Sequence, residues 1–406
     1  MKRVLICGID GYIGYPLALH LLRKDYEVCG VDNYSRRRLV MSVGSDSLTP
    51  IAPPSTRDMY LHDQGKFIDV VASIDLEDYY LISEVLKEYK PDIIVHLAEQ
   101  PSAPWSMRSP RDCLDTQRGN VLGTLSLLWA MKKHCPDVHL LKLGTMGEYG
   151  TPGCDIPEGE IPKHCLSDQV YSNYLVNGPP AELEYIQVKA ECPMSTLPFP
   201  RSPNSFYHLS KVHDTHNIIF ACKTWGLRST DIMQGVVFGV KPFWSKEDLE
   251  LTRFDYDEYF GTAINRFCAQ AVGDLPLTVY GKGNQTRGFL SLSDSIQCLT
   301  IAIENEPKPG EYRVFNQFEN TYAIDTLAKV IATHAEKLGI KAEVRHLPNP
   351  RTEADKHYYN PMHQKLFDLG YIPSNIDSQI QKLLVDILPY KDRVLTTSIL
   401  PTTTWK

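Results

Sequence analysis

The stretch that decides the fold is residues 4–14, which read Val4-Leu5-Ile6-Cys7-Gly8-Ile9-Asp10-Gly11-Tyr12-Ile13-Gly14. A short apolar run, typical of a buried strand, leads into a glycine-rich turn and then into a helical pattern over residues 12–24. Glycines at such a turn let the backbone approach a pyrophosphate, which the helix N-terminus then holds with free amides and its dipole. The spacing is weak by itself, because tight turns also use glycine for steric reasons.

The following strand strengthens this interpretation. It spans residues 27–32 and ends at Asp32, 18 residues after Gly14. A carboxylate at that place can hydrogen-bond the adenosine ribose diol and repel a 2′-phosphate, which favours NAD. Arg36 would argue for NADP instead, but Asp32 is closer to the predicted ribose site. We therefore predict that NAD is the cofactor.

Apolar strands and helical patterns continue to alternate through the first 150 residues. Helices are expected over 78–87 and 121–133, and strands over 92–98 and 139–144. This alternation predicts an α/β fold, a Rossmann-type doubly wound parallel sheet with helices on both faces. We expect residues 1–240 to form this dinucleotide-binding domain. Residues 241–406 are expected to form a smaller C-terminal α/β domain that binds substrate, with the chain crossing back near 285–320.

Two segments interrupt the alternation. Residues 33–74 look too irregular for a helix and are predicted to be a functional loop. Residues 151–204 are rich in proline and are predicted to form a lid-like insert. A helix should begin at the N-cap Ser205 and run to about Trp225, followed by one strand over 229–238.

Composition excludes several classes of function. The 406 residues carry a net charge of −7, and no run of like charge is longer than the triplet at 36–38, so no nucleic-acid surface is expected. No window approaches 18 apolar residues, and no membrane span is expected. The ten cysteines form no CxxC pair, and His213 and His216 are interpreted as ordinary helix-surface or packing residues, so no metal site is expected. The cytoplasm is the predicted location, or the plastid stroma if a transit peptide has been removed.

Tyr207 and Lys211 lie four residues apart at the start of the long helix and therefore share one helical face. A nearby ammonium lowers the pKa of a phenol, so that the phenol can exchange a proton with a sugar hydroxyl during hydride transfer. The spacing alone is common by chance, and Tyr185 and Lys189 repeat it within the proline-rich insert. Because Tyr207 opens a helix, we predict that Tyr207 is the functional copy.

Thr145 directly follows the predicted strand over 139–144, at the sheet edge where doubly wound folds bind ligands. Its hydroxyl can bridge a substrate hydroxyl and the Tyr207 phenol. Glu148, three residues on, is predicted to move a second proton.

These features together resemble the extended short-chain dehydrogenases that act on nucleotide sugars, and most closely the UDP-sulfoquinovose synthases. The resemblance covers nearly the whole chain. The segments that carry it are 47–52, 145–152 (Thr-Met-Gly-Glu-Tyr-Gly-Thr-Pro), 205–214 (with Tyr-His-Leu-Ser-Lys), 234–239, 276–283, 285–288, 348–351 and 391–394.

The resemblance implies a reaction sequence on UDP-glucose. NAD oxidises C4, the acidified C5 proton and the C6 hydroxyl leave to give a 4-keto-5,6-ene, sulfite adds at C6, and the hydride returns to C4. Tyr207 would be the C4 base and Lys211 its pKa modulator and nicotinamide-ribose anchor. Arg287 and Arg351 would hold the pyrophosphate.

The residues so implied fall into three groups. The catalytic set is Thr145, Met146, Glu148, Tyr207, His208 and Lys211. The NAD-binding set is Gly8, Gly11, Tyr12, Ile13, Gly14, Asp32, Asn33, Arg36, Asp75, Leu76, Leu97, Asn120, Tyr207, Lys211 and Val237. The substrate-binding set is Gln100, Thr145, His208, Gln234, Thr262, Thr278, Tyr280, Arg287 and Arg351.

The chain departs from the family at residue 101, where Pro101 stands in place of an arginine expected to contact the sulfonate or sulfite. Arg108 is the nearest replacement. The proline-rich segment 156–200 is also longer than expected. Two alternatives therefore stay open. One is a nucleotide-sugar 4-epimerase or a 5,6- or 4,6-dehydratase that does not use sulfite, and the other is a catalytically silent NAD-binding sensor or scaffold. By analogy with the family, a homodimer is expected through the helices over 121–133 and 205–225.

Overall fold

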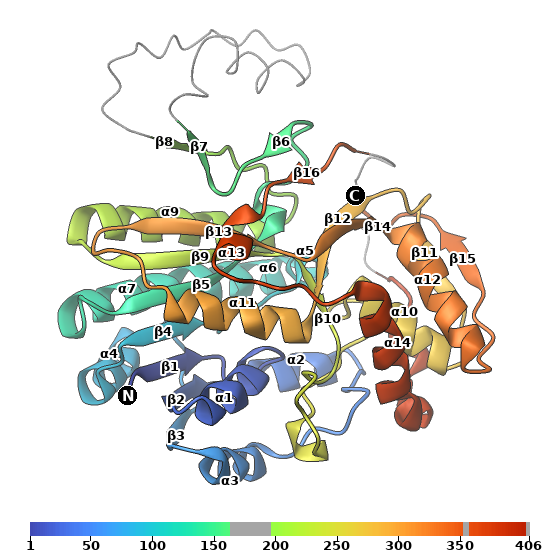
Figure 1. Cartoon of the computed structure of the whole chain (residues 1–406), viewed down its shortest axis with the longest axis horizontal. Coiled ribbons are helices and arrows are strands. Elements are labelled where there is room, and N and C mark those ends of the chain that lie inside the picture. Colours follow the sequence, from blue (N-terminus) through green and yellow to red (C-terminus); the bar gives the residue numbers. More distant parts are fainter. Residues whose placement is uncertain (163–195, 352–356, 403–406) are drawn as a thin grey trace, which may run out of the picture.

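A computed structural model describes residues 1–162, 196–351 and 357–402. Its largest element is a sheet of seven parallel strands in the order β13-β9-β5-β4-β1-β2-β3 (Figure 1). This order confirms the predicted Rossmann-type fold. The strands are β1 (Arg3–Cys7), β2 (Glu27–Asp32), β3 (Phe67–Ala72), β4 (Ile93–His96), β5 (His139–Thr145), β9 (Arg228–Gln234) and β13 (Tyr312–Gln317).

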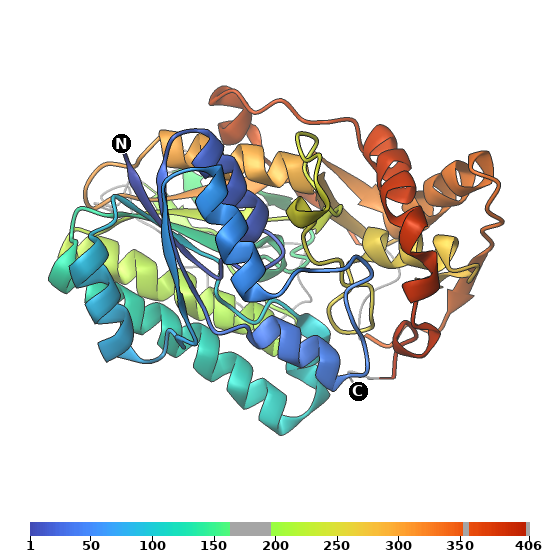
Figure 2. The ribbon, with the colours of Figure 1, turned by 90° about the horizontal axis from the view of Figure 1, so that it is seen from below.

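Helices cover both faces of this sheet, because its strands are apolar on both sides. One apolar core lies under α1 (Gly14–Arg23), α3 (Pro54–Gln64) and α11 (Leu292–Glu304). The other lies under α4 (Tyr79–Tyr89), α7 (Gly123–His134) and α9 (Phe206–Trp225). Seen from below, α4, α7 and α9 run side by side along one flank (Figure 2).

A smaller part stands beside the carboxyl ends of the large sheet. It contains a three-stranded sheet, a two-stranded sheet and a core of its own. Its elements are β10 (Val236–Phe238), β12 (Thr286–Ser291), β14 (Asn320–Ala323), β11 (Leu277–Tyr280), β15 (Val344–Leu347), α10 (Ala263–Val272), α12 (Ile324–Lys337) and α14 (Ile376–Ile387). Between β12 and β14 in the sequence, the chain returns to the large sheet as α11 and β13. The domain boundary at residue 240 stays a prediction.

Shorter elements connect these parts. They include α5 (Ala103–Arg108), α6 (Pro110–Gln117), a π-helical turn at Arg118–Leu122, a 3₁₀ turn at Met146–Glu148 and α13 (Gln364–Asp368). None of the helices in the described ranges combines the length and the apolar character needed to cross a bilayer.

The prediction of an irregular loop over 33–74 was wrong. The segment contains α2 (Ser35–Ser42), α3 and the edge strand β3. Pro54 occupies the first turn of α3, where its missing N–H is not needed. The helix is also held by a long-range contact that no local pattern reveals, because the buried Arg57 donates to the Leu251 carbonyl oxygen at 2.9 Å.

The prediction of a single strand over 229–238 was also wrong, because the strand is interrupted at Gly235. The residues before it continue the large sheet as β9, and those after it join the small sheet as β10. A Cβ at Gly235 would lie 2.8 Å from the Gly288 carbonyl oxygen and 3.0 Å from that of Gln317. Three backbone segments therefore meet at this point, and only glycine fits.

Of the predicted insert, the structure describes β6 (Asp155–Ile156), β7 (Glu160–Pro162) and β8 (Thr196–Pro198). β6 pairs with β16 (Asn360–Pro361), and β7 pairs with β8. Residues 163–195 of the insert, including Tyr185 and Lys189, lie outside the described residues. The helix start at Ser205 is confirmed, since its hydroxyl accepts the His208 N–H at 3.1 Å.

Candidate active site

One cavity of about 1050 Å³ lies at the carboxyl ends of the parallel strands, between the two parts of the molecule. Its wall includes the residues that follow β1, β2, β4, β5 and β9, the edge at which doubly wound sheets bind ligands. Most of the predicted residues line it: Gly8, Gly11, Tyr12, Ile13, Gly14, Asp32, Asn33, Arg36, Asp75, Leu76, Leu97, Gln100, Asn120, Thr145, Met146, Tyr207, His208, Lys211, Gln234, Val237, Thr262, Tyr280, Arg287 and Arg351. Glu148 and Thr278 are not part of this wall.

The glycine turn forms a cradle that a side chain would fill. Gly8 has φ +89°, which favours glycine, and a Cβ there would lie 2.9 Å from the Ala98 nitrogen. A Cβ on Gly14 would lie 2.1 Å from the Gly8 carbonyl oxygen. Because α1 begins at Gly14, the cradle presents a helix N-terminus to the cavity, which suits a pyrophosphate.

Asp32 is held firmly at the end of β2. Its carboxylate accepts the backbone N–H of Asp10 at 2.9 Å and that of Tyr34 at 2.7 Å. Burial raises the pKa of Asp32, and these two hydrogen bonds oppose the rise. The neighbouring Asn33 side chain donates to Asp75, so these two residues of the predicted NAD-binding set are hydrogen-bonded to each other.

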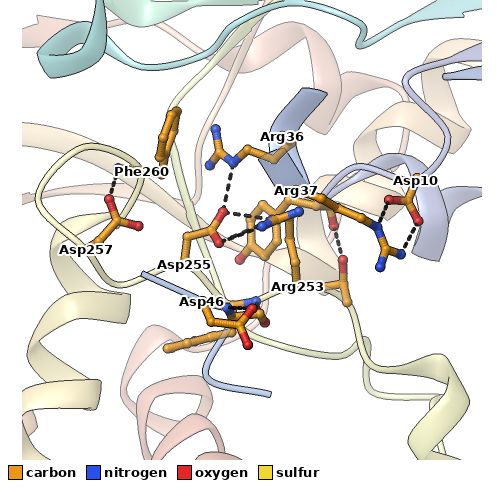
Figure 3. Close-up of polar contacts among 12 residues, drawn as sticks. Asp10, Arg36, Arg37, Asp46, Arg253, Asp255, Asp257 and Phe260 are labelled. Carbon is orange, nitrogen blue, oxygen red and sulfur yellow. Dashed lines mark hydrogen bonds and ion pairs between the residues drawn. The ribbon is translucent and has the colours of Figure 1, made fainter. Parts of the chain in front are cut away.

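Two of the three arginines after Asp32, Arg36 and Arg37, contact carboxylates (Figure 3), and Arg38 donates to the Asn33 carbonyl oxygen. Arg36 Nε donates to Asp255 at 2.9 Å and its guanidinium lies 4.0 Å from the centre of the Phe260 ring. Arg37 binds both oxygens of Asp10, at 2.6 and 2.7 Å. Arg36 shares Asp255 with Arg253, and Asp32 remains the group that favours NAD. Among the described residues, the buried Arg36 Nη1 has no hydrogen-bond partner.

These features fit NAD. The cradle would hold the pyrophosphate, Asp32 would meet the ribose diol, and the unpartnered Arg36 Nη1 lies in the same wall.

The predicted catalytic residues meet at the centre of the wall. Tyr207 opens α9 and lies beside Thr145, which ends β5 and whose hydroxyl lowers the pKa of the phenol. Its backbone N–H donates to the Ser106 hydroxyl at 3.0 Å, which ties α9 to α5. One turn on, Lys211 Nζ donates to the Leu143 carbonyl oxygen at 2.6 Å and lies 6.0 Å from the Tyr207 ring centre.

Lys211 was expected to lower the pKa of Tyr207, but its charge is paired elsewhere. Lys211 Nζ lies 2.6 Å from the carboxylate of Glu99. Burial raises the pKa of Tyr207 and the Glu99 charge adds to the rise, while Lys142 and the hydrogen bond with Thr145 oppose it. Sequence reasoning missed Glu99, although it directly follows the third predicted strand.

His208 occupies space that only glycine leaves open. A Cβ on Gly147 would lie 2.2 Å from His208 Nε2. His208 Nδ1 is 2.9 Å from the Ser205 hydroxyl. Burial, with smaller contributions from Arg351 and Arg287, lowers the pKa of His208 to about 3. The imidazole is therefore neutral at pH 7 and offers one N–H and one acceptor.

Glu148 does not occupy the predicted proton-transfer position. The 3₁₀ turn at 146–148 rotates its fully buried side chain behind the wall, where it lies 3.4 Å from Lys142 Nζ and accepts from Thr215 at 3.1 Å. Thr278 is also buried away from the cavity, because it is hydrogen-bonded to Gln270.

The wall near Pro101 is held by neighbouring side chains. Gln100 donates to the Ser102 carbonyl oxygen and to Thr116. Arg108 lines the cavity, lies 3.9 Å from the Trp105 ring centre and is paired with Asp112 at 2.8 Å. Its charge is therefore balanced by a residue of the next helix, α6.

At the far end, Arg287 Nη1 lies 2.9 Å from His357 Nε2. His213 and His216 lie on the exposed face of α9. Within residues 1–162, 196–351 and 357–402, no group of three or more histidine, cysteine, aspartate or glutamate residues is placed to hold a metal ion.

Comparison with known proteins identifies close relatives. The model of the NAD dependent epimerase/dehydratase family matches residues 4–316. A chloroplastic UDP-sulfoquinovose synthase of Spinacia oleracea is 46% identical over all of this chain and 79% of its own length. A UDP-sulfoquinovose synthase of Sulfolobus acidocaldarius is 42% identical over all of this chain and 98% of its own.

Solved structures share the fold at lower identity. The UDP-glucose 4-epimerase of Thermotoga maritima with UDP-glucose has a TM-score of 0.66 at 17% identity, over 94% of this chain and 97% of its own. The UDP-glucose 4-epimerase of Bifidobacterium longum with NAD⁺ and UDP also has a TM-score of 0.66, at 18% identity, over 98% of this chain and all of its own.

Proposed function

The chain belongs to the NAD dependent epimerase/dehydratase family and, within it, to the UDP-sulfoquinovose synthases, and from this membership we propose that it converts UDP-glucose and sulfite into UDP-sulfoquinovose. One observation carries the proposal: relatives named UDP-sulfoquinovose synthase match the whole chain at 46% and 42% identity. The residues proposed for the redox steps also meet on one cavity wall.

NAD, when bound, takes the hydride from C4 of the sugar and later returns it. Tyr207, as phenolate, accepts the C4 hydroxyl proton, and Thr145 aligns that hydroxyl with the phenol. Oxidation at C4 acidifies the C5 proton, so loss of that proton and of the C6 hydroxyl as water gives a 4-keto-5,6-ene. Sulfite then adds at C6 and a proton returns to C5, which balances the reaction as one sulfite and one proton consumed for each water released.

Because Glu148 lies behind the wall, we assign the proton transfers at C5 and at the C6 hydroxyl to other groups. His208 and Met146 line the cavity next to Tyr207, whose ring centre is 4.9 Å from that of His208. The neutral His208 can donate to the leaving C6 hydroxyl or accept from it. Arg287 and Arg351, at the far end, would hold the diphosphate.

Mass spectrometry of the protein incubated with NAD and UDP-glucose, with and without sulfite, tests the function. We expect a UDP-sugar in which sulfonate replaces a hydroxyl, formed only when sulfite is present. That product would also show that Pro101 is tolerated. A keto-ene, a dehydrated sugar or UDP-galactose that forms regardless of sulfite would instead assign the chain to the epimerase or dehydratase chemistry of its distant structural neighbours.

We also propose that the protein is a homodimer. Large apolar side chains are exposed on α6, the π-helical turn, α7 and α9, and the helices over 121–133 and 205–225 were predicted to pair. They are Leu114, Leu122, Trp129, Phe206 and Phe220. In a two-fold symmetric dimer each of these side chains would be buried on both protomers. Burial would stabilise the dimer by about 1.5–3 kcal/mol per side chain.

Phe220→Glu is therefore expected to shift the protein from dimer to monomer in multi-angle light scattering at micromolar concentration. Phe220 is 59% exposed on α9. Phe243→Glu is the matched control, because Phe243 is 73% exposed outside α6, α7 and α9. A wild-type monomer, or a Phe220→Glu variant that stays dimeric, would contradict the proposed interface.

For the location, both predicted compartments remain in the proposal, and the relative named as chloroplastic supports the plastid stroma.

A further inference from the structure

The lysine of the active site is bound by a buried carboxylate. Lys211 Nζ lies 2.6 Å from Glu99 Oε2 and donates to the Leu143 carbonyl oxygen at 2.6 Å. The side chains of Lys211 and Glu99 are 5% and 2% exposed. At this distance and burial the pair is held in one geometry, and its two charges cancel for their surroundings.

Glu99 is ionised despite its burial. It follows β4, and its other oxygen lies 3.5 Å from His96 Nε2. Burial by itself would raise the pKa of Glu99, but Lys211 and His96 lower it below the ordinary value. Burial lowers the pKa of His96 to about 4, so this imidazole is neutral at pH 7 and Lys211 is the counter-ion of Glu99.

A second layer of charges lies behind this pair. Lys142, fully buried on β5, lies 3.4 Å from Glu148, 3.5 Å from Asp231 and 3.3 Å from the Lys211 carbonyl oxygen. Arg201 lies 3.9 Å from the second oxygen of Glu148. This layer balances its own charges and leaves Glu99 and Lys211 to balance each other.

Asp214 is the remaining buried carboxyl of the cluster, and its pKa is shifted in the opposite direction to that of Glu99. Burial, and then the nearby charge of Glu99, raise the pKa of Asp214 well above its ordinary value. Both effects favour the protonated form of Asp214. Replacing Glu99 with glutamine removes the carboxylate that contacts Lys211, whereas the two carboxyl oxygens of Asp214 have no hydrogen-bond partner among the described residues.

Glu99 is also the carboxylate that acts most strongly on the catalytic phenol. The charged groups that face Tyr207 are Glu99 after β4, Lys142 on β5, Glu148 in the turn after β5 and Lys211 on α9. His208, the other titratable neighbour on α9, is neutral. Removing the Glu99 charge would leave Lys211 as an uncompensated cation one helical turn from the phenol.

We propose that Glu99 is a positioning residue for the proton-transfer step: it anchors Lys211 against the Leu143 carbonyl oxygen and cancels the charge of Lys211 beside the Tyr207 phenol. The inference rests on the proposed function, because it names the group that sets the acid–base balance of the same Tyr207–Lys211 site. It adds to that site a residue 112 positions from Lys211 in the sequence.

The test is the pH dependence of hydride transfer in Glu99→Gln, followed as the absorbance rise at 340 nm when UDP-glucose is added to the NAD-loaded protein without sulfite. Tyr207 acts as a base, so the rate rises as pH passes through its pKa. In Glu99→Gln this rise is expected about one pH unit lower than in the wild type. The KM for UDP-glucose should stay within about threefold, because Glu99 acts on the proton-transfer group.

Asp214→Asn is the matched control, a buried carboxyl of the same cluster whose oxygens have no hydrogen-bond partner among the described residues. Its pH profile should superimpose on that of the wild type. A Glu99→Gln rate that falls equally at every pH, with no displacement of the profile, would show a merely structural role and overturn the proposal. Absence of any signal in the wild type would count against UDP-glucose as substrate, not against the role of Glu99.

A second readout needs no turnover. Protein carrying ¹³Cζ-tyrosine shows the ionisation of Tyr207 directly by NMR, with the resonance assigned by its loss in Tyr207→Phe. In the wild type the resonance should move only at the alkaline end of the titration. In Glu99→Gln the movement should begin about one pH unit lower. Superimposable titrations of the two proteins would overturn the proposal whatever the substrate.

Discussion

Tyr207→Phe is expected to slow hydride transfer from UDP-glucose by about 10³-fold, because phenylalanine cannot accept the C4 hydroxyl proton. The ring itself is retained against His208, so the packing of the buried side chain changes little. The measurement is the single-turnover rise in absorbance at 340 nm after UDP-glucose is added to the NAD-loaded protein. The Kd for UDP-glucose should change by less than about threefold.

The second tyrosine with the same spacing provides the control. Tyr185 and Lys189 repeat the pattern in the proline-rich insert, and Tyr185→Phe should leave the rate unchanged. Hydride transfer in Tyr207→Phe within tenfold of the wild type would mean that another group takes the C4 proton. Loss of the rate in Tyr185→Phe alone would move the catalytic role to the insert.

Gly14→Ala is expected to remove bound NAD almost completely. The added Cβ would lie 2.1 Å from the Gly8 carbonyl oxygen and 2.9 Å from the Ile9 Cα, so the backbone of the cradle must move. Each 1.4 kcal/mol of lost binding costs tenfold in Kd, and we expect a loss of at least about 100-fold. The nucleotide released from the purified, denatured protein measures the occupancy.

Gly119→Ala is the control for this substitution, because an added methyl there would meet no atom within 4 Å. It should retain its NAD. If Gly14→Ala retained a full complement of NAD with an unchanged melting temperature, the cradle would not be the pyrophosphate site. A large fall in melting temperature of the NAD-free wild type and of Gly14→Ala alike would indicate only that NAD stabilises the fold.

The parts of the site that could be predicted depend on residues close together in the chain. The glycine turn, the carboxylate at the end of β2, Thr145 at the end of β5 and the N-cap of α9 are each defined by neighbours within a few positions. Helix and strand periods and turn chemistry act over that range, so a single sequence carries them.

Where prediction failed, the deciding contact came from elsewhere in the chain. The segment 33–74 folds as helices partly because Arg57 reaches the Leu251 carbonyl oxygen and Asp10. Gly235 divides one apolar run between two sheets because the backbones of Gly288 and Gln317 converge on it. Neither partner can be recognised in the local pattern.

Glu148 shows the same limit at the active site. Its position three residues after Thr145 suggested a second proton-transfer group, but a 3₁₀ turn directs it toward Lys142 and Thr215, behind the wall. Glu99, which had no predicted role, faces Lys211. Side chains a few residues apart can point to opposite sides of a wall, and only the packed strands decide which side is the cavity.

The sequence by itself determined the fold class, the cofactor cradle and the Thr145–Tyr207–Lys211 set, because each is encoded in residues that act on their immediate neighbours. Only the tertiary structure decided the charge state of that set. The pairings of Glu99 with Lys211 and of Asp255 with Arg36 join residues 112 and 219 positions apart. Such pairs form where strand ends meet and exclude water, and burial of that kind, which lowers the pKa of Glu99 beside Lys211 and raises that of Asp214, is a property of the packed molecule.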